Sequence, residues 1–281
     1  MSERPPLSRL RLAPLRLVQF AAIQLACCVF PIAVFVGLAA SVLVWQRFQV
    51  PMARYDALLV YVVVVQLVLV AVGFESWREL LVICAFHLVG LALEVFKVHV
   101  GSWVYPDAGI VRLGGVPIFS GFMYASVGSY ICQAFRRFDL SVDGFRWWPV
   151  TGLAVAAYAN FYTHHAIADL RWVIAAGFVV VLWGSTIRFT VGGDRYRMPT
   201  AVAFVLIGVF LWLAENAGTL LNAWRYPDQR DGWHMVHVGK LGSWALLISL
   251  SFVLVAAVKA KEGVVYGDGE ARVTRERLTK G

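Results

Sequence analysis

Hydrophobic residues in this chain fall in long blocks rather than in the alternating or every-third-residue patterns of soluble domains. A stretch such as YVVVVQLVLVAVGF is apolar on every side, which predicts a helix surrounded by apolar groups. Blocks long enough to cross about 30 Å of hydrocarbon, at about 1.5 Å per residue, occupy residues 17–45, 57–73, 80–98, 116–135, 148–168, 172–187, 199–221 and 241–258. The pattern predicts an all-α, polytopic transmembrane helical bundle of about eight spans.

Composition supports this prediction, because 60% of the residues are hydrophobic and 15% are charged, far too apolar for a soluble chain of 281 residues. Strands of membrane barrels alternate apolar and polar residues, so we expect helices to form the spans. The polar ends are residues 1–16 and 259–281. We interpret them as basic cytoplasmic tails that flank one integral membrane domain at residues 17–258.

The formal net charge of +8 is distributed unevenly around the predicted spans. If the N-terminus is cytoplasmic, most arginines and the lysines of the C-terminal tail lie inside, and the outside keeps Arg47, Arg54, Lys97, Arg112, Arg171, Arg225, Arg230 and Lys240. This positive-inside pattern predicts that both termini are cytoplasmic. The basic charge therefore indicates topology and contact with the lipid bilayer, and we expect no nucleic-acid partner.

One motif occurs twice. ALEVFKVHVGSWVYPD (residues 92–107) and LAENAGTLLNAWRYPD (residues 213–228) carry Glu, Trp, Tyr, Pro and Asp at the same five offsets. The copies end the third and seventh predicted spans, so both helices run in the same direction. This internal repeat favours a parallel duplication of a four-helix unit, with independent recurrence as the alternative.

Glu94 and Glu215 are the carboxylates that fall inside predicted spans. An ionised carboxylate in hydrocarbon is costly, so each is expected to be neutral, paired or facing a polar cavity, unless it reaches water at the helix end. His87 and Lys97 lie on the helical face of Glu94. These four residues are the candidate catalytic group, and the alternative is a Glu94–Lys97 pair that only neutralises charge.

The aromatic turn after each glutamate supplies candidate binding residues. Trp and Tyr suit the membrane interface, which is one interpretation. The matched Pro-Asp suggests another, a rigid external turn that closes over a site, because Pro stiffens a turn and Asp satisfies its backbone donors. The candidate binding residues are Trp103, Tyr105, Asp107, Trp224, Tyr226, Asp228, Tyr124, Asn160 and Tyr162.

A metal site is a weaker hypothesis. His165 and Asp169 have the helical i,i+4 spacing and His164 is adjacent, so these three residues are candidate ligands. No HExxH signature supports them, and the four cysteines lie in apolar blocks without CxxC spacing. We therefore expect no disulfide framework, and the sequence indicates no particular cofactor.

The segments EVFKVHVGSWVYPDAGIVRLGGVPIFSGFMYASVGSYICQAFRRFDL, YANFYTHH, RFTVGGDRYRMP, LAENAGTLLNAWRYPD and GKLGSWALL carry a resemblance. With them the chain resembles the YoaT-like family of uncharacterised bacterial membrane proteins (domain of unknown function 817). The resemblance covers nearly all of the membrane core and implies a multi-pass protein of the bacterial inner membrane, without an established reaction.

A more distant likeness is to membrane carotenoid cyclase and hydratase enzymes. It rests on a glutamate, an aromatic turn and a Gly-Val-Pro that enters the next span, similar here to Glu94, Gly101, Tyr105 and residues 115–117. The second copy departs from it, because WHMVHVGKLG has no Gly-Val-Pro.

These observations lead first to an intramembrane enzyme that acts on a lipid-soluble, isoprenoid-like small molecule, with Glu94 and Glu215 as acid or base groups. A small-solute or proton-coupled transporter with paired glutamates is the alternative from another class. A non-catalytic membrane scaffold is the third. The residues do not decide between enzyme and non-enzyme, and they leave the oligomeric state open.

Overall fold

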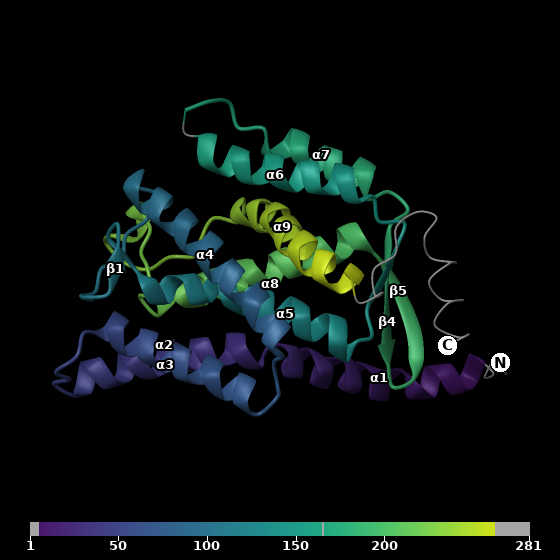
Figure 1. Ribbon diagram of the computed structural model, residues 1–281, viewed down its shortest axis with the longest axis horizontal. Helices are drawn as coiled ribbons and strands as arrows, with labels where there is room; N and C mark the ends of the chain where they lie inside the picture. Colours follow the sequence, from purple (N-terminus) through teal and green to yellow (C-terminus); the bar gives the residue numbers. More distant parts are fainter. Residues whose placement is uncertain (1–5, 165, 262–281) are drawn as a thin grey trace.

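The computed structural model describes residues 6–164 and 166–261, and this part of the chain is mostly helical (Figure 1). Most helices run along the long axis of the molecule, with α4 and α9 tilted against it. The helices are α1 (Pro6–Cys27), α2 (Val29–Arg47), α3 (Arg54–Ala71), α4 (Trp77–His99), α5 (Gly121–Arg137), α6 (Trp147–Thr163), α7 (Arg171–Val181), α8 (Thr200–Leu220) and α9 (Lys240–Lys261). There are two short 3₁₀ turns: η1 (Ile118–Ser120) directly precedes α5, and η2 (Pro227–Gln229) includes the Pro-Asp of the second aromatic turn.

Helices α2, α3, α4, α8 and α9 are long and apolar enough to cross a membrane. Their outward faces carry large apolar side chains that a soluble protein would bury, such as Leu67, which is 60% exposed, and Leu88, which is 65% exposed. The prediction of a helical membrane protein is therefore confirmed. The count of about eight spans and the duplication stay predictions.

Two of the predicted spans differ from the observed helices. Block 17–45 divides at Cys28 into α1 and α2, and Pro31 lacks the N–H that would bond to the carbonyl of Cys27 and continue the helix. Block 172–187 contains only the 11 residues of α7 before the chain turns at Gly184, whose φ is +81°. A helix of that length extends about 16 Å, half the thickness of the hydrocarbon.

A small antiparallel sheet closes one end of the bundle, which we call the sheet end. Its strands β3 (Ser141–Asp143), β4 (Thr186–Val191) and β5 (Asp194–Pro199) lie in the order β3-β4-β5. Gly192 and Gly193, with φ of +55° and +84°, form the tight turn between β4 and β5. The prediction of an all-α fold did not include this sheet, because the arginine-rich sequence of its strands is also typical of a cytoplasmic turn.

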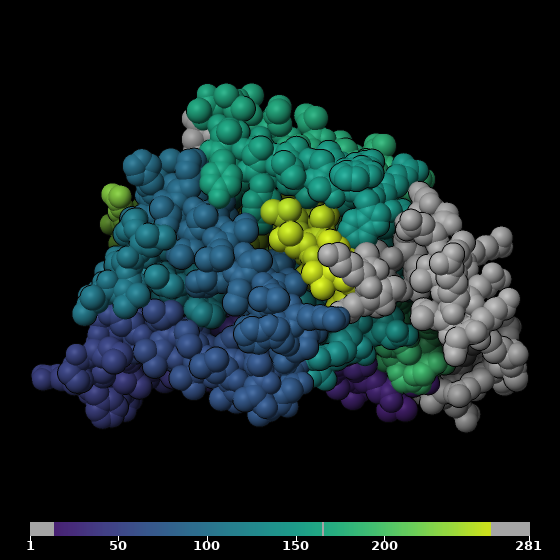
Figure 2. Space-filling model, viewed as in Figure 1, coloured from purple at the N-terminus to yellow at the C-terminus, as the bar shows by residue number. Residues whose placement is uncertain are grey.

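The opposite end, which we call the motif end, holds both Trp-x-Tyr-Pro-Asp turns and the short hairpin of β1 (Arg112–Leu113) and β2 (Val116–Pro117). Helices α4 and α8 both run toward it (Figure 1). α4 packs on α5 and α8 packs on α9. Gly90 and Gly208 allow these contacts, since a Cβ on either would clash with Tyr124 or Ala245. The space-filling view shows α9 exposed between α4 and the α6–α7 pair (Figure 2).

Candidate functional site

The two aromatic turns pair with each other at the motif end. Val104 N–H donates to the Arg225 carbonyl at 3.0 Å, and Arg225 N–H donates back to Val104 at 2.9 Å. Val104 and Arg225 are each the central residue of a Trp-x-Tyr sequence. The two turns pair in antiparallel fashion, although the helices before them, α4 and α8, run in the same direction. This pairing brings the two glutamate-bearing helices to one place.

Glu94 accepts hydrogen bonds from three neutral aromatic donors. Trp103 Nε1 lies 2.6 Å and Tyr105 Oη 2.7 Å from its Oε2, and Tyr124 Oη on α5 lies 2.7 Å from its Oε1. Trp103 and Tyr105 are 6% exposed, so the first aromatic turn folds inward over the carboxyl group. Buried polar groups need such partners, and each carboxyl oxygen of Glu94 has at least one.

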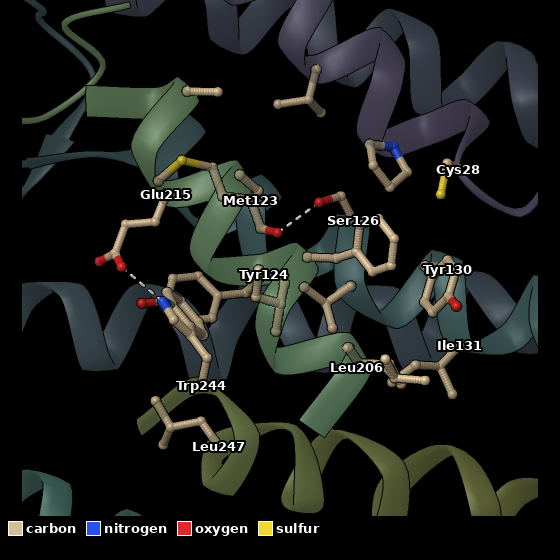
Figure 3. Close-up of a pocket in the computed structure, with 18 of the residues that line it drawn as sticks. Cys28, Met123, Tyr124, Ser126, Tyr130, Ile131, Leu206, Glu215, Trp244 and Leu247 are labelled. Atoms are coloured by element: carbon tan, nitrogen blue, oxygen red, sulfur yellow. Dashed lines mark hydrogen bonds between the residues drawn. The ribbon is translucent and has the colours of Figure 1, made fainter. Parts of the chain in front are cut away.

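Glu215 has a related but different set of partners. Tyr226 Oη donates to its Oε1, in the place that Tyr105 takes for Glu94. The indole donor is Trp244 of α9, whose Nε1 lies 2.9 Å from Oε2 (Figure 3). Trp224, the counterpart of Trp103 in the sequence, instead packs tightly over Gly218. The second copy therefore keeps the tyrosine contact and replaces the tryptophan contact.

Lys240, the first residue of α9, joins the two copies. Its Nζ lies 3.7 Å from Glu215 Oε1, 3.8 Å from the ring centre of Tyr226 and 5.5 Å from that of Trp103. The rings of Trp103 and Tyr226 pack edge to face at 5.8 Å. One cation thus contacts aromatic groups of both turns, and its carboxylate partner is Glu215.

The tyrosines of the two turns remain hydrogen-bond donors. Burial, together with the adjacent glutamate, raises the pKa of Tyr105 and of Tyr226 well above the usual range. Both hydroxyl groups therefore keep their protons at physiological pH and donate to the carboxyl groups.

Both glutamates line a single cavity of about 1490 Å³. Its lining is mainly aliphatic and aromatic, and it extends from the motif end past Tyr130 and Ile131 of α5 toward Phe189 and Met198 of the sheet. Figure 3 shows Glu215 and Trp244 on one side and Tyr130, Ile131 and Cys28 on the other. The cavity is a long apolar space whose carboxyl groups lie at one end.

The other candidate catalytic residues are placed differently. Lys97 also lines the cavity, but its Nζ turns toward α6, donating to the Phe161 carbonyl at 2.7 Å and lying 3.8 Å from the Phe161 ring centre. His87 packs against Phe122, with ring centres 4.5 Å apart, and is not among the described residues that line the cavity. Of the residues predicted to share one helical face, Lys97 therefore lies at the cavity, whereas His87 lies at the contact between α4 and α5.

The two aspartates of the motif also differ. Asp107 forms a 2.5 Å ion pair with Arg54, which further donates to the Leu221 carbonyl at the end of α8. Asp228 is 67% exposed on its side chain, and its backbone carbonyl accepts from His234. Only the first aspartate fastens the two turns together.

The remaining binding and metal candidates lie near the end of α6. Tyr162 packs on Phe96, and Asn160 bonds to Asp169 at 3.0 Å, which in turn pairs with Arg171. His165 lies outside the described residues. Within the described chain no group of three or more His, Cys, Asp or Glu side chains could hold a metal ion.

Several contributing residues were not predicted from sequence. Lys240 and Trp244 are four apart at the start of the last span, so the spacing that places them on one face was present in GKLGSWALL. Arg54 and Tyr55 bind both turns, because Tyr55 Oη donates to the Ala223 carbonyl and accepts from Asp107 N–H. No local pattern indicates those contacts, which span more than 50 residues.

Fold and site together define a membrane protein with a large, mainly apolar cavity that two glutamates line. Residues 16–252 match the family described as "Protein of unknown function (DUF817)", and the chain belongs to this family, as the sequence predicted. Uncharacterized protein YoaT of Bacillus subtilis (strain 168) is 47% identical over 247 residues, which cover 87% of this chain and 92% of that protein.

Two solved structures show a more distant similarity. They are the Insig homolog MvINS of Mycobacterium vanbaalenii, at 15% identity, and a cross-linked MvINS trimer, at 16% identity. Each matches with a TM-score of 0.46 over 64% of this chain and 93% of the other chain.

Proposed function

We propose that this protein is an intramembrane enzyme that takes a lipid-soluble, isoprenoid-like substrate into the cavity and uses Glu94 and Glu215 as acid and base groups. One observation carries the proposal. Two buried glutamates, 3% and 4% exposed, line the same largely apolar cavity of about 1490 Å³. Small-molecule pockets commonly measure about 300–1,000 Å³, so this volume suits an extended hydrocarbon.

The hydrogen bonds indicate which oxygen of each glutamate can carry a proton. An indole N–H only donates, so Trp103 and Trp244 each require the Oε2 atom that they contact to be an acceptor. A proton on Glu94 would therefore lie on Oε1, beside Tyr124, whose hydroxyl can also accept. On Glu215 the corresponding oxygen faces Tyr226 and Lys240.

The charges around the two carboxyl groups favour different roles. Glu94 receives its hydrogen bonds from neutral groups, which suits an acid that holds a proton in an apolar site. Glu215 lies 3.7 Å from the Lys240 ammonium group, which favours a charged carboxylate that accepts a proton or stabilises positive charge in a substrate. The two copies of the motif would thus supply one group of each kind.

The test compares host lipids in cells that express wild type, Glu94→Gln, Glu215→Gln or the control Asp139→Asn, with insertion and folding checked for each. Asp139 is an exposed aspartate at the sheet end with a φ of 49°, which Asn also tolerates. We expect mass spectrometry of extracted lipids to show loss of a product with both glutamine variants and no change with the control. Unchanged profiles with well-folded glutamine variants would refute the enzyme.

A proton-coupled transporter is the second candidate, and Glu75 is the observation that favours it. This carboxyl group lies between α3 and α4, is 1% exposed, and accepts hydrogen bonds from Gln66 and Ser129. It provides a further buried titratable group away from the motif end. A proton flux into vesicles that Glu94→Gln abolishes, with host lipids unchanged, would support transport instead.

For orientation in the membrane, we propose that the sheet end is cytoplasmic, along with both tails (residues 1–16 and 259–281). The arginines of the sheet strands, Arg188, Arg195 and Arg197, support this through the positive-inside rule. Single cysteines introduced at Gly193 and Asp231 of a cysteine-free variant test it. A membrane-impermeant thiol reagent applied to intact inner-membrane spheroplasts should label position 231 and leave position 193 unlabelled; the reverse result would overturn the orientation.

A further inference from the structure

Three cationic side chains converge on the cavity at the motif end, and each comes from a different helix. They are Lys97 in the last turn of α4, Arg171 at the start of α7 and Lys240 at the start of α9, and we call them the cationic rim. All three line the same cavity as the glutamates. Lys97 is only 2% exposed, and its Nζ donates to the Phe161 carbonyl at 2.7 Å.

The rim is held in place by neighbouring groups. Arg171 Nε lies 2.6 Å from Asp169, and its Nη1 lies 3.3 Å from the Ser243 hydroxyl of α9. Lys240 is 3.7 Å from Glu215, beyond ordinary hydrogen-bond distance. Like charges that share a poorly solvated space repel each other strongly, and an anion placed between them would relieve that repulsion.

The backbone adds positive potential at the same place. α7 and α9 both begin at the motif end, so their N-terminal N–H groups and helix dipoles lie beside Arg171 and Lys240. Below the rim, the cavity continues as an apolar space toward the sheet end. A cationic entrance above an apolar interior is complementary to an amphiphile with an anionic head and a hydrocarbon chain.

We propose that the cationic rim binds the phosphate head of a lipid phosphate monoester whose chain extends into the cavity. A phosphate carries more negative charge than a carboxylate and offers three acceptor oxygens, which matches three cations from three helices. Lys97 lies one turn beyond Glu94, and Lys240 adjoins Glu215. A head bound at the rim therefore places the first carbons of the chain beside the two carboxyl groups.

This inference rests on the proposed function and adds the class of substrate. Its test uses the purified full-length protein in nanodiscs and three probes: farnesyl phosphate, farnesol and inorganic phosphate. Farnesol has the same chain without the phosphate, and inorganic phosphate has no chain. We expect farnesyl phosphate to bind at least about tenfold more tightly than farnesol, because one charge-assisted hydrogen bond contributes about 1.5–3 kcal/mol.

Variants locate the binding. Lys97→Met and Arg171→Gln should each weaken farnesyl phosphate binding by about tenfold or more while leaving farnesol binding unchanged. Arg230→Gln is the matched control, since Arg230 is an exposed arginine of the motif end that does not line the cavity. Equal affinities for farnesyl phosphate and farnesol, equally tight binding of inorganic phosphate alone, or an equal loss in the control would each overturn the proposal.

The two proposals fail in different ways. If binding depends on the phosphate but Glu94→Gln and Glu215→Gln leave host lipids unchanged, the phosphate-binding rim is supported and the enzyme function is refuted. If the glutamine variants change host lipids but farnesyl phosphate and farnesol bind equally well, the enzyme function is supported and the phosphate-binding rim is refuted.

Discussion

The two glutamates should respond unequally to the same substitution. In Glu94→Gln the amide oxygen can take the place of Oε2, where it accepts from Trp103 and Tyr105, while the amide NH₂ faces Tyr124, whose hydroxyl can reverse and accept. All three contacts persist, and because a protonated Glu94 is neutral like glutamine, the loss is limited to the poorer fit of the amide group to the three donors. We expect a destabilisation of about 1 kcal/mol.

Glu215→Gln places its NH₂ group toward both Tyr226 and the Lys240 ammonium group, because Trp244 again requires the oxygen at Oε2. The ammonium group then faces a donor and loses its carboxylate. Breaking a fully buried pair costs about 3–5 kcal/mol and an exposed one about 0–1 kcal/mol. Since Lys240 is 35% exposed on its side chain, we expect about 1–2 kcal/mol beyond the loss in Glu94→Gln.

Thermal unfolding in detergent measures this difference with a thiol-reactive dye, in proteins whose half-buried Cys28 and exposed Cys84 are replaced by alanine. The remaining Cys27 and Cys132 are buried and react only on unfolding. At about 2–4 °C per kcal/mol, the Tm of Glu215→Gln should lie about 2–8 °C below that of Glu94→Gln. Adding Lys240→Met should recover part of the loss in Glu215→Gln but not in Glu94→Gln. Equal Tm values, or equal effects of Lys240→Met in the two backgrounds, would refute the assignment of Lys240 to Glu215.

Three further predictions concern the surroundings of the site. Arg54→Gln should lower the Tm by several degrees, since it removes the ion pair to Asp107 and the contact with the end of α8, and limited proteolysis should show both turns becoming cleavable. Gly90→Ala should cost about 1–3 kcal/mol in the same dye assay, because its Cβ would clash with the Tyr124 ring that orients a donor to Glu94. Burial raises the pKa of Glu75, so the folded state binds the carboxyl proton more tightly than the unfolded chain does. This tighter binding stabilises the folded state at low pH, and the contribution is lost as the pH rises and Glu75 ionises. The Tm of wild type should therefore fall relative to that of Glu75→Gln as the pH rises above the usual range of a carboxyl pKa, and parallel profiles would contradict this.

Much of the membrane architecture could be predicted from sequence because its cause is local. Long apolar blocks define α2, α3, α4, α8 and α9. The matched offsets in the two motif copies indicated that Glu94 and Glu215 occupy equivalent positions. The sheet was missed because strands β4 and β5 are short and arginine-rich. Their pairing depends on a Gly-Gly turn and on β3, which lies more than 40 residues earlier.

The interior of the site could be predicted only in part. Trp103 and Tyr105 fit an interfacial belt as well as a turn over a cavity, and only the three-dimensional path of the chain directs both toward Glu94. The roles of Arg54 and Tyr55 depend on contacts with residues 221–223, far along the chain. Such partners have no periodicity, so no local pattern could indicate them.

The helix that follows each motif copy explains how the two sites differ. After the first copy, α5 brings Tyr124, a neutral hydroxyl, to Glu94; after the second, α9 brings Lys240 and Trp244 to Glu215. The repeated segment itself supplies a tyrosine donor in both places and an indole donor only in the first. Two sites with one charge environment would favour the same protonation state and the same chemistry. A repeat whose partner helices differ by one cation instead places two unlike carboxyl groups on one cavity, which is the arrangement that paired acid and base chemistry requires.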